Sequence, residues 1–271
     1  MHKNKVIYTC VAGNYDQIIN HSLVNLDYDY ICFTDHIPEN KDDYIWKFRP
    51  LQFDKLDHAR NNRWHKLHPH LILPEYQESL YLDGNINIKD KAFFKQLRYF
   101  ENKNELIRIN PHFDRTNIYD EFNECLQTPK DNINLISLQM KKIRESGFDG
   151  NYYNHHFFEN NIILRRHHSS LCKKIMADWW RWIENYSYRD QLSLTYVLWQ
   201  NNFLVEYLFS KNIRSLKSVA ITNSLNHENS ENQKLKNQIT ALKDELKEIH
   251  DSKIFKVYNL YQQYKEKILK K

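Results

Sequence analysis

The sequence predicts an α/β domain built on a parallel sheet with helices on both faces, followed by a helical tail. In the first hundred residues, runs rich in β-branched and aromatic residues alternate with segments of helical pattern, which is typical of parallel sheets. Hydrophobic residues make up 41% of the 271 residues, enough for a core. Beyond about residue 225 the sequence becomes polar, so we expect one domain over residues 1–225 and an appendage over residues 226–271.

The first half of the chain alternates between strand and helix patterns. Its first strand is a continuous apolar run, KVIYTCV, as expected for a strand buried on both faces. Pro69 ends the second helix, because a proline ring cannot continue a helix. The predicted elements are strands at 5–11, 28–35 and 44–50, a strand within 79–88, and helices at 16–25 and 56–68.

The second half is richer in helix. Trp179 and Trp182 fall on one face of a predicted helix, which indicates a stripe that packs into the core. In the appendage, apolar residues from Leu235 to Ile249 follow a heptad spacing that predicts a short coiled coil. The predicted elements are strands at 105–109, 157–165 and 203–209 and helices at 90–99, 117–127, 131–146, 168–185 and 190–201.

Polar residues follow three of the predicted strands. Ligands of parallel sheets bind beyond the carboxyl ends of the strands. The segments that follow the first, second and fourth strands are Ala12–Tyr15, Thr34-Asp35 and Asp83–Asn85. We therefore expect these segments to share one rim of the sheet and to form part of a binding site.

The stretch SLYLDGNINI, residues 79–88, has two readings. Asp-Gly or Gly-Asn between alternating strands is a strong signal for a β-hairpin turn. The same residues offer a carboxylate at Asp83 and an amide oxygen at Asn85, the kind of ligands that Mg²⁺ or Mn²⁺ takes together with substrate phosphates. Taken alone, the tripeptide leaves both readings open.

A predicted helix carries three cations at intervals of three residues. Arg60, Arg63 and Lys66 would lie near one another on its surface, where they could pair with the oxygens of a diphosphate. A solvated basic face is the alternative. The histidines of this segment lack a convincing zinc-ligand spacing.

Two later segments hold polar residues next to predicted strands or helices. Glu159, Asn160 and Asn161 lead into an apolar strand and could bind sugar hydroxyls, or else serve as turn or capping residues. Arg189, Asp190 and Gln191 stand at the start of a predicted helix. Asp190 could orient a sugar hydroxyl or act as a base, or it could simply cap the helix.

The net charge of +5 belongs to the tail. The last twenty residues contain six Lys and one Glu, so the rest of the chain carries equal numbers of basic and acidic side chains. This excludes a basic nucleic-acid-binding body and suits a tail that meets an anionic surface. The four cysteines form no CxxC pair, and we expect buried free thiols in a reducing cytoplasm.

Neither a secretory pattern nor an apolar run near the ~18 residues of a membrane helix is present, so we expect a cytoplasmic protein.

The order of the motifs is more informative than any one of them. The series YTCVAGNYD, DYICFTD, RNNRWHKLHPH, SLYLDGNINI, ENNIILRRH and RDQLSLTYVLW, over residues 5 to 214, resembles the TOD/MUCI-type glycosyltransferase-like domain family. The resemblance implies a GT-A-like fold with a mixed, mostly parallel sheet, and transfer of a sugar from a nucleotide-activated donor. We expect a UDP-sugar donor and a glycan or lipid-linked acceptor in a bacterial surface polysaccharide.

The resemblance also assigns roles to the candidate residues. Donor-binding residues would be Ala12, Asn14, Tyr15, Thr34, Asp35, Arg60, Arg63, Lys66 and Asp83. Asp83 and Asn85 would hold Mn²⁺ or Mg²⁺ as the counterpart of a D-x-D motif, from which Asn85 departs. Asp190 and Gln191 would contact the donor sugar with retention of configuration. Acceptor-binding residues would be Glu159, Asn160, Asn161 and Arg189.

Some expectations stay open. If the reaction inverts, Asp190 or Glu159 could act as the base. His227 could be a further metal ligand, but the residues around it match the family pattern poorly.

The tail resembles extensions of surface-polysaccharide transferases that meet the inner face of the membrane. Residues 252–271 would make that contact, but the tail could instead form oligomers. A non-catalytic scaffold protein with the same fold is the alternative function.

Overall fold

The structure is a computed structural model of the chain, and it describes residues 3–13, 15–128, 131–150 and 157–222. All of these residues belong to one compact unit, Met1–Ser224. The predicted coiled coil, the basic segment at residues 252–271 and His227 lie outside the described residues.

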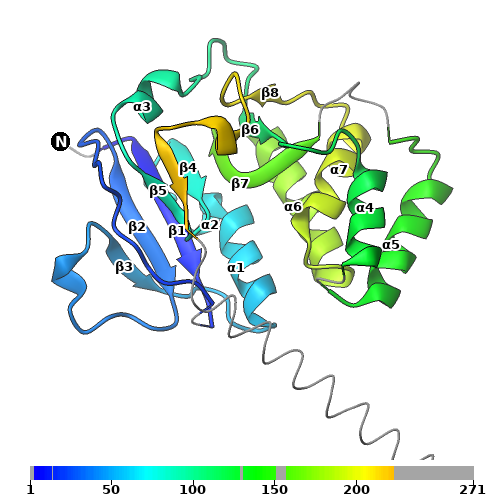
Figure 1. The fold of residues 1–271 in the computed structure, drawn as a ribbon, viewed down its shortest axis with the longest axis horizontal. Coiled ribbons are helices and arrows are strands. Elements are labelled where there is room, and N and C mark those ends of the chain that lie inside the picture. Colours follow the sequence, from blue (N-terminus) through cyan, green and yellow to red (C-terminus); the bar gives the residue numbers. More distant parts are fainter. Residues whose placement is uncertain (1–2, 14, 129–130, 151–156, 223–271) are drawn as a thin grey trace, which may run out of the picture. The chain divides into compact units, whose positions relative to one another are not determined.

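A seven-stranded sheet forms the centre of the described part, in the order β3-β2-β1-β4-β7-β6-β8 (Figure 1). The neighbouring pairs from β3 to β4 are parallel, whereas β7 runs antiparallel to both β4 and β6. The α/β class with a mixed, mostly parallel sheet is thereby confirmed. The strands are β1 Lys5–Val11, β2 Asp29–Thr34, β3 Lys47–Pro50, β4 Glu78–Leu82, β6 Ile107–Pro111, β7 Phe158–Arg165 and β8 Glu206–Tyr207.

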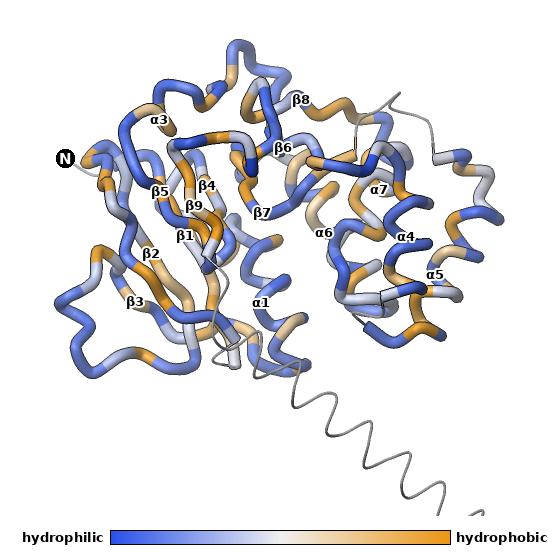
Figure 2. The backbone as a smooth tube through the Cα atoms, viewed as in Figure 1, coloured by the Kyte–Doolittle hydropathy of each residue, from blue (hydrophilic) through white to orange (hydrophobic). Residues whose placement is uncertain are grey.

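Both faces of the central strands are buried. Along β1, Tyr8 packs in the cluster that includes Trp179, whereas its neighbour Ile7 packs in a second cluster with Phe93. In Figure 2, hydrophobic segments lie along the strands, and the outer loops are mostly hydrophilic. The helices are α1 His58–Leu67, α2 Pro69–Ile72, α3 Ala92–Gln96, α4 Ile118–Gln127, α5 Ile133–Glu145, α6 Ser170–Asn185 and α7 Leu194–Gln200, with 3-10 turns η1 Lys41–Asp43, η2 Asp190–Leu192 and η3 Ile213–Ser215.

The turn at Asp83–Asn85 is real, but the hairpin is not. β4 pairs inside the large sheet, while β5, Ile86–Ile88, pairs with β9, Val219–Ile221. The amide of Ile86 donates to the carbonyl of Asp83 at 3.0 Å, which closes a tight turn at the carboxyl end of β4. A Cβ at Gly84 would lie 3.0 Å from a methyl of Val11, a tight contact that a small shift of the Val11 side chain would have to relieve.

One other expectation was wrong, and a second is confirmed only in part. Residues 16–25 form no helix; the segment instead uses long-range partners, such as the bond from the Leu23 amide to the Ile88 carbonyl at 3.0 Å. The segment at 203–209 forms only the two-residue strand β8. By contrast, α1 ends at Leu67, and Pro69 then opens α2 at the first helical position, where its missing N–H is harmless.

Candidate active site

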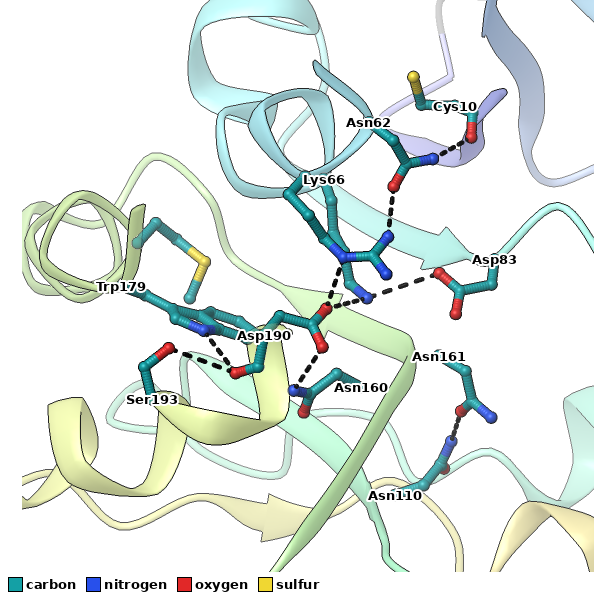
Figure 3. A network of polar contacts seen from close by, with 12 residues as sticks. Cys10, Asn62, Lys66, Asp83, Asn110, Asn160, Asn161, Trp179, Asp190 and Ser193 are labelled. Carbon is teal, nitrogen blue, oxygen red and sulfur yellow. Dashed lines mark hydrogen bonds and ion pairs between the residues drawn. The ribbon is translucent and has the colours of Figure 1, made fainter. Parts of the chain in front are cut away.

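Asp190 lies at the centre of a buried ionic cluster (Figure 3). Its Oδ2 is 2.7 Å from Lys66 Nζ and 3.2 Å from Arg63 Nε. Asn160 donates to its Oδ1 at 3.4 Å. The Asp190 side chain is only 5% exposed and makes no helix-capping bond, so the capping alternative does not describe it. Residues more than a hundred positions apart in sequence thus converge on one carboxylate.

The backbone around this cluster is anchored in the core. The carbonyl of Lys66, at the end of α1, accepts hydrogen bonds from Arg165 at 2.6 Å and from the Tyr8 hydroxyl at 2.9 Å. The carbonyl of Asp190 accepts from the indole of Trp179 at 3.0 Å, and Trp179 is fully buried as predicted. The side chains of Lys66 and Asp190 are therefore brought together by two fixed backbones.

The charges of the cluster stabilise one another. Burial alone would raise the pKa of Asp190, but Lys66 and Arg63 outweigh it and lower this pKa to about 2. Burial would likewise lower the pKa of Arg63, but the charges of Asp190 and Asp83 raise it above its ordinary value. Asp190 is therefore a carboxylate at any physiological pH and is a weak base.

This pKa predicts a dependence of stability on pH. Because the pKa of Asp190 is lower in the folded than in the unfolded chain, its contribution is complete above the unfolded value, near pH 4, and is lost as pH falls toward about 2. The difference in unfolding free energy between the wild type and Asp190→Asn should shrink by about 2–3 kcal/mol across that window. Urea unfolding at several pH values measures it; a constant difference from pH 6 to pH 2 would contradict the assignment.

Asp83 lies next to this cluster, at the carboxyl end of β4. Its Oδ1 is 3.5 Å from Lys66 Nζ, and its side chain is 29% exposed. Its amide donates to the carbonyl of Asn161 at 2.8 Å, which ties the turn to β7. Lys66 thus stands between a buried carboxylate, Asp190, and a partly exposed one, Asp83.

Three buried oxygens near these carboxylates accept no hydrogen bond from any residue that the structure describes. They are Asn110 Oδ1, Glu159 Oε2 and Asn160 Oδ1, on residues that are 0–6% exposed. The Asn160 amide is oriented by Asp190, since only its NH₂ group can donate to that carboxylate. Buried polar atoms normally have partners. Such a group of acceptors suits a ligand that supplies hydroxyl donors.

The shape of β7 creates this group of acceptors. Ile109 of β6 pairs with Ile163, but Asn110 pairs with Glu159, so residues 160–162 bulge out of the β6 ladder. Bulges of this kind redirect side chains. Sequence reasoning missed Asn110 and also Arg214, whose guanidinium lies 3.3 Å from Glu159 Oε1. Neither residue stands in a recognisable motif.

The loop after β1 meets the end of β2. The Gly13 amide donates to Asp35 Oδ2 at 2.8 Å, and His58 Nδ1 lies 3.9 Å from the same oxygen. Thr34 Oγ1 accepts from the His36 amide at 3.1 Å. Ala12 is buried and Tyr15 is exposed, while Asn14 lies outside the described residues. Two of the three segments of the expected rim are therefore in contact, through Gly13 and Asp35.

Gly13→Ala is expected to destabilise the protein. Gly13 has φ +67, where an L side chain is strained, and a Cβ would lie 2.2 Å from the His58 ring. The backbone term alone should lower the free energy of unfolding by about 1–3 kcal/mol. Urea unfolding measures it. Adding His58→Ala should recover part of the loss, since it removes the ring but leaves the backbone strain and the His58 Cβ 2.7 Å from the new methyl group; full recovery would contradict the backbone argument.

Two predicted site residues, Arg60 and Arg189, pair with groups outside the Asp190 cluster. The Arg60 guanidinium donates to the carbonyls of Ile183 and Tyr186 and pairs with Asp57 at 2.6 Å. Arg189 pairs with Glu121 of α4 at 2.9 Å. Gln191 is half-buried next to Asp190. Three residues turn a helix by about 300°, which is about 60° short of a full turn. Arg60 and Lys66 are six residues apart, so their side chains point about 120° apart.

The carboxylate of Asp16 lies close to Gly84, and the two residues that flank this glycine, Asp83 and Asn85, could offer oxygens to a divalent ion. They share one tight turn, and both are partly exposed. Within the described residues, no three His, Cys, Asp or Glu side chains are grouped to hold a metal. Mg²⁺ is commonly bound by one or two protein oxygens together with water and phosphate. The residues present fit an ion that takes its other ligands from a bound phosphate.

Two expectations about the rest of the chain can be compared with the structure. The four cysteines are buried and free, as predicted. No helix in the described part of the chain is long and apolar enough to span a bilayer.

A family model described as "TOD1/MUCI70, glycosyltransferase-like domain" matches residues 1–219. No curated protein matches the chain.

Among solved structures, WbbM bifunctional glycosyltransferase in its apo form is 13% identical at a TM-score of 0.43, over 75% of this chain but only 38% of its own. Mouse xyloside xylosyltransferase 1, apo form, is 11% identical at 0.41, over 76% and 84% of the two chains. The galactosyltransferase LgtC, in complex with donor and acceptor sugar analogs, is 14% identical at 0.40, over 75% and 72%. Likenesses this distant add no weight to a particular activity.

Proposed function

The chain belongs to the TOD1/MUCI70 glycosyltransferase-like domain family, and on that premise we propose that it transfers a sugar from a nucleotide-sugar donor to a glycan or lipid-linked acceptor. The observation that carries the proposal is the placement of Asp83 at the carboxyl end of β4, 3.5 Å from Lys66 and beside the Asp190 cluster. Such a rim is where α/β sheets bind their ligands. We further propose a GT-A-like arrangement of the donor.

The donor would span the rim from the first strand to the fourth. The loop from Ala12 to Tyr15, including Asn14, and the end of β2 at Thr34 and Asp35 would hold the nucleoside, with UDP favoured. Arg63, whose side chain is 23% exposed, is the cation that can reach a diphosphate. Lys66 is buried and acts on the diphosphate through its charge. Arg60 and Arg189 hold the surrounding elements in place.

Asp83 and Asn85 would hold Mn²⁺ or Mg²⁺ against the diphosphate. When bound, the ion would neutralise the charge that develops on the leaving group. Arg63 would also neutralise charge on the leaving group, because its guanidinium is charged and is held in place by Asp190. The fixed positions of donor and acceptor supply the rest of the rate enhancement by replacing a bimolecular encounter.

Asp190 and Gln191 would contact the donor sugar. A carboxylate whose pKa is lowered to about 2 by two cations is too weak a base to remove a proton from a hydroxyl group. We therefore favour transfer with retention of configuration. Inversion would need Glu159, whose pKa is raised by burial despite Arg214. The anomeric configuration of the product, read by NMR, together with Glu159→Gln, distinguishes these outcomes.

The hydroxyl groups of the bound sugar would donate hydrogen bonds to the side-chain oxygens of Asn110, Glu159 and Asn160, with Asn161 beside them. Among the described residues, none donates a hydrogen bond to these oxygens, and an unmade hydrogen bond of a buried group costs about 1–3 kcal/mol. A polyhydroxyl ring would supply the missing donors. This favours a sugar over a nucleic acid or an acidic peptide as the partner.

We place the reaction in the synthesis of a bacterial surface glycan such as capsule or lipopolysaccharide. In this proposal, residues 252–271 bring the protein to the inner face of the membrane through their six Lys. Flotation of intact and 1–251 protein with anionic liposomes tests it. Equal flotation of the two proteins would refute a tail anchor and leave oligomerisation as the role of the tail.

A screen of donor hydrolysis tests the activity itself. UDP-, GDP- and CMP-sugars are incubated with the protein and Mn²⁺, and the free nucleotide is measured. We expect release from one class of donor, reduced at least tenfold in Asp83→Ala. Tight nucleotide binding without hydrolysis, and without transfer to any acceptor in a glycan panel, would instead identify a non-catalytic scaffold protein.

A further inference from the structure

The Lys66 ammonium group lies between the carboxylates of Asp83 and Asp190. Its Nζ is 2.7 Å from Asp190 Oδ2 and 3.5 Å from Asp83 Oδ1, and its side chain is 1% exposed. The ammonium group also lies 5.0 Å from the centre of the Tyr81 ring. Figure 3 shows it reaching from α1 toward both carboxylates. Asp83 therefore already has a cationic neighbour.

The four ionised groups in direct contact carry no net charge: Asp83 and Asp190 contribute two negative charges, and Lys66 and Arg63 contribute two positive ones. One further carboxylate, that of Asp16, lies close to the turn, since a Cβ on Gly84 would lie 3.6 Å from its Oδ2. Arg63 feels the charge of Asp83 as well as that of Asp190. Asn85 completes the turn with a neutral amide instead of a second carboxylate. A divalent ion at Asp83 would thus add two positive charges beside two cations that are already paired with Asp190 and Asp83.

Lys66 cannot easily withdraw to make room. The carbonyl of Lys66 accepts hydrogen bonds from Arg165 and Tyr8, and both of these residues are buried in the core. Withdrawal of its ammonium group would also leave Asp190, which is buried, with one cation fewer. The positive charge beside Asp83 is therefore a fixed property of the site.

We propose that Lys66 makes binding of the divalent cation conditional on the nucleotide: the nucleotide-free protein does not hold Mn²⁺ or Mg²⁺ at Asp83, and the cation binds there only together with a nucleoside diphosphate. The diphosphate supplies both the oxygen ligands and the negative charge that the cluster lacks. This inference rests on the proposed function for the nature of the nucleotide. The metal affinity of the nucleotide-free protein can be measured independently of it.

The test compares Mn²⁺ affinity in four proteins by electron paramagnetic resonance, which counts free Mn²⁺. Lys66→Met removes the fixed cation, and Asn85→Asp adds a carboxylate to the turn; each makes the cluster more negative by one unit. Lys141→Met removes the same charge from an exposed site on α5 and serves as the control. Each titration is run alone and with saturating UDP or GDP.

We expect the wild type and Lys141→Met to bind Mn²⁺ at least about tenfold more tightly with the nucleotide than without it. Without nucleotide, Lys66→Met and Asn85→Asp should each bind at least about tenfold more tightly than the wild type. If Lys66→Met does not fold, Asn85→Asp, on the partly exposed turn, decides.

Tight Mn²⁺ binding by the nucleotide-free wild type, or no gain in Asn85→Asp, would overturn the inference. Failure of every nucleoside diphosphate to bind would instead overturn the proposed function, and the nucleotide-free comparison of the wild type with Asn85→Asp would still decide the role of the fixed charge.

Discussion

Asp190→Asn is expected to lower the free energy of unfolding by about 3–5 kcal/mol, because it leaves Lys66 and Arg63 without their buried counter-ion. The replacement keeps the size of the side chain and removes only its charge. Both cations lie within 3.2 Å of the carboxylate, and the Lys66 side chain is 1% exposed. Chemical denaturation at neutral pH measures the loss.

Asp178→Asn provides the matched control. Asp178 also pairs with two cations, Lys174 and Arg181, but their side chains are 61% and 71% exposed, so its loss should be within about 1 kcal/mol. The double variant Asp190→Asn, Lys66→Met should lose less unfolding free energy than the sum of the losses in the two single variants, by about 0.5–3 kcal/mol. Equal losses in Asp190→Asn and Asp178→Asn would contradict the buried cluster.

Asp83→Ala should act on activity and leave the fold intact. Asp83 is partly exposed, and Lys66 keeps its closer partner Asp190 when Asp83 is removed. Loss of an electrostatic group at the leaving diphosphate should lower the rate of transfer by about 10²–10³-fold. Steady-state kinetics with the donor found in the hydrolysis screen measure it, and thermal unfolding confirms the fold.

An exposed acid on η1 gives the comparison. Asp42→Ala removes the same charge from an exposed position on η1, and its rate should equal that of the wild type. A transfer rate in Asp83→Ala within about threefold of the wild type would contradict the role of this rim, since a residue at the leaving group is expected to change the rate by far more.

Local sequence patterns were sufficient for most of the elements. The apolar run at 5–11 became β1, Lys5–Val11, because burial on both faces selects a continuous apolar strand. The helices at 117–127 and 131–146 became α4 and α5 within a residue or two, with Asn117 and Asn132 as N-caps. The formation of these elements depends on residues that are close to them in the sequence.

The parts that sequence reasoning missed depend on distant neighbours. The antiparallel direction of β7, its bulge and the pairing of β5 with β9 leave no local signal. The bulge places Asn110 among the acceptor oxygens. Of the three cations expected to act together, Arg63 and Lys66 converge on Asp190, whereas Arg60 turns toward the end of α6. Helical geometry already separates Arg60 from Lys66, and the packing of α1 on α6 determines which carbonyls Arg60 meets.

The most direct test of the proposed activity is a calorimetric titration of nucleoside diphosphates into the protein in the presence of Mn²⁺. The proposal predicts that at least one of UDP, GDP and CDP binds the wild type, and that Asp83→Ala binds the same nucleotide at least about tenfold more weakly, a difference of about 1.4 kcal/mol. If none of the three binds the wild type, or if the two proteins bind equally well, the rim around Asp83 is not a donor site and the proposal is wrong.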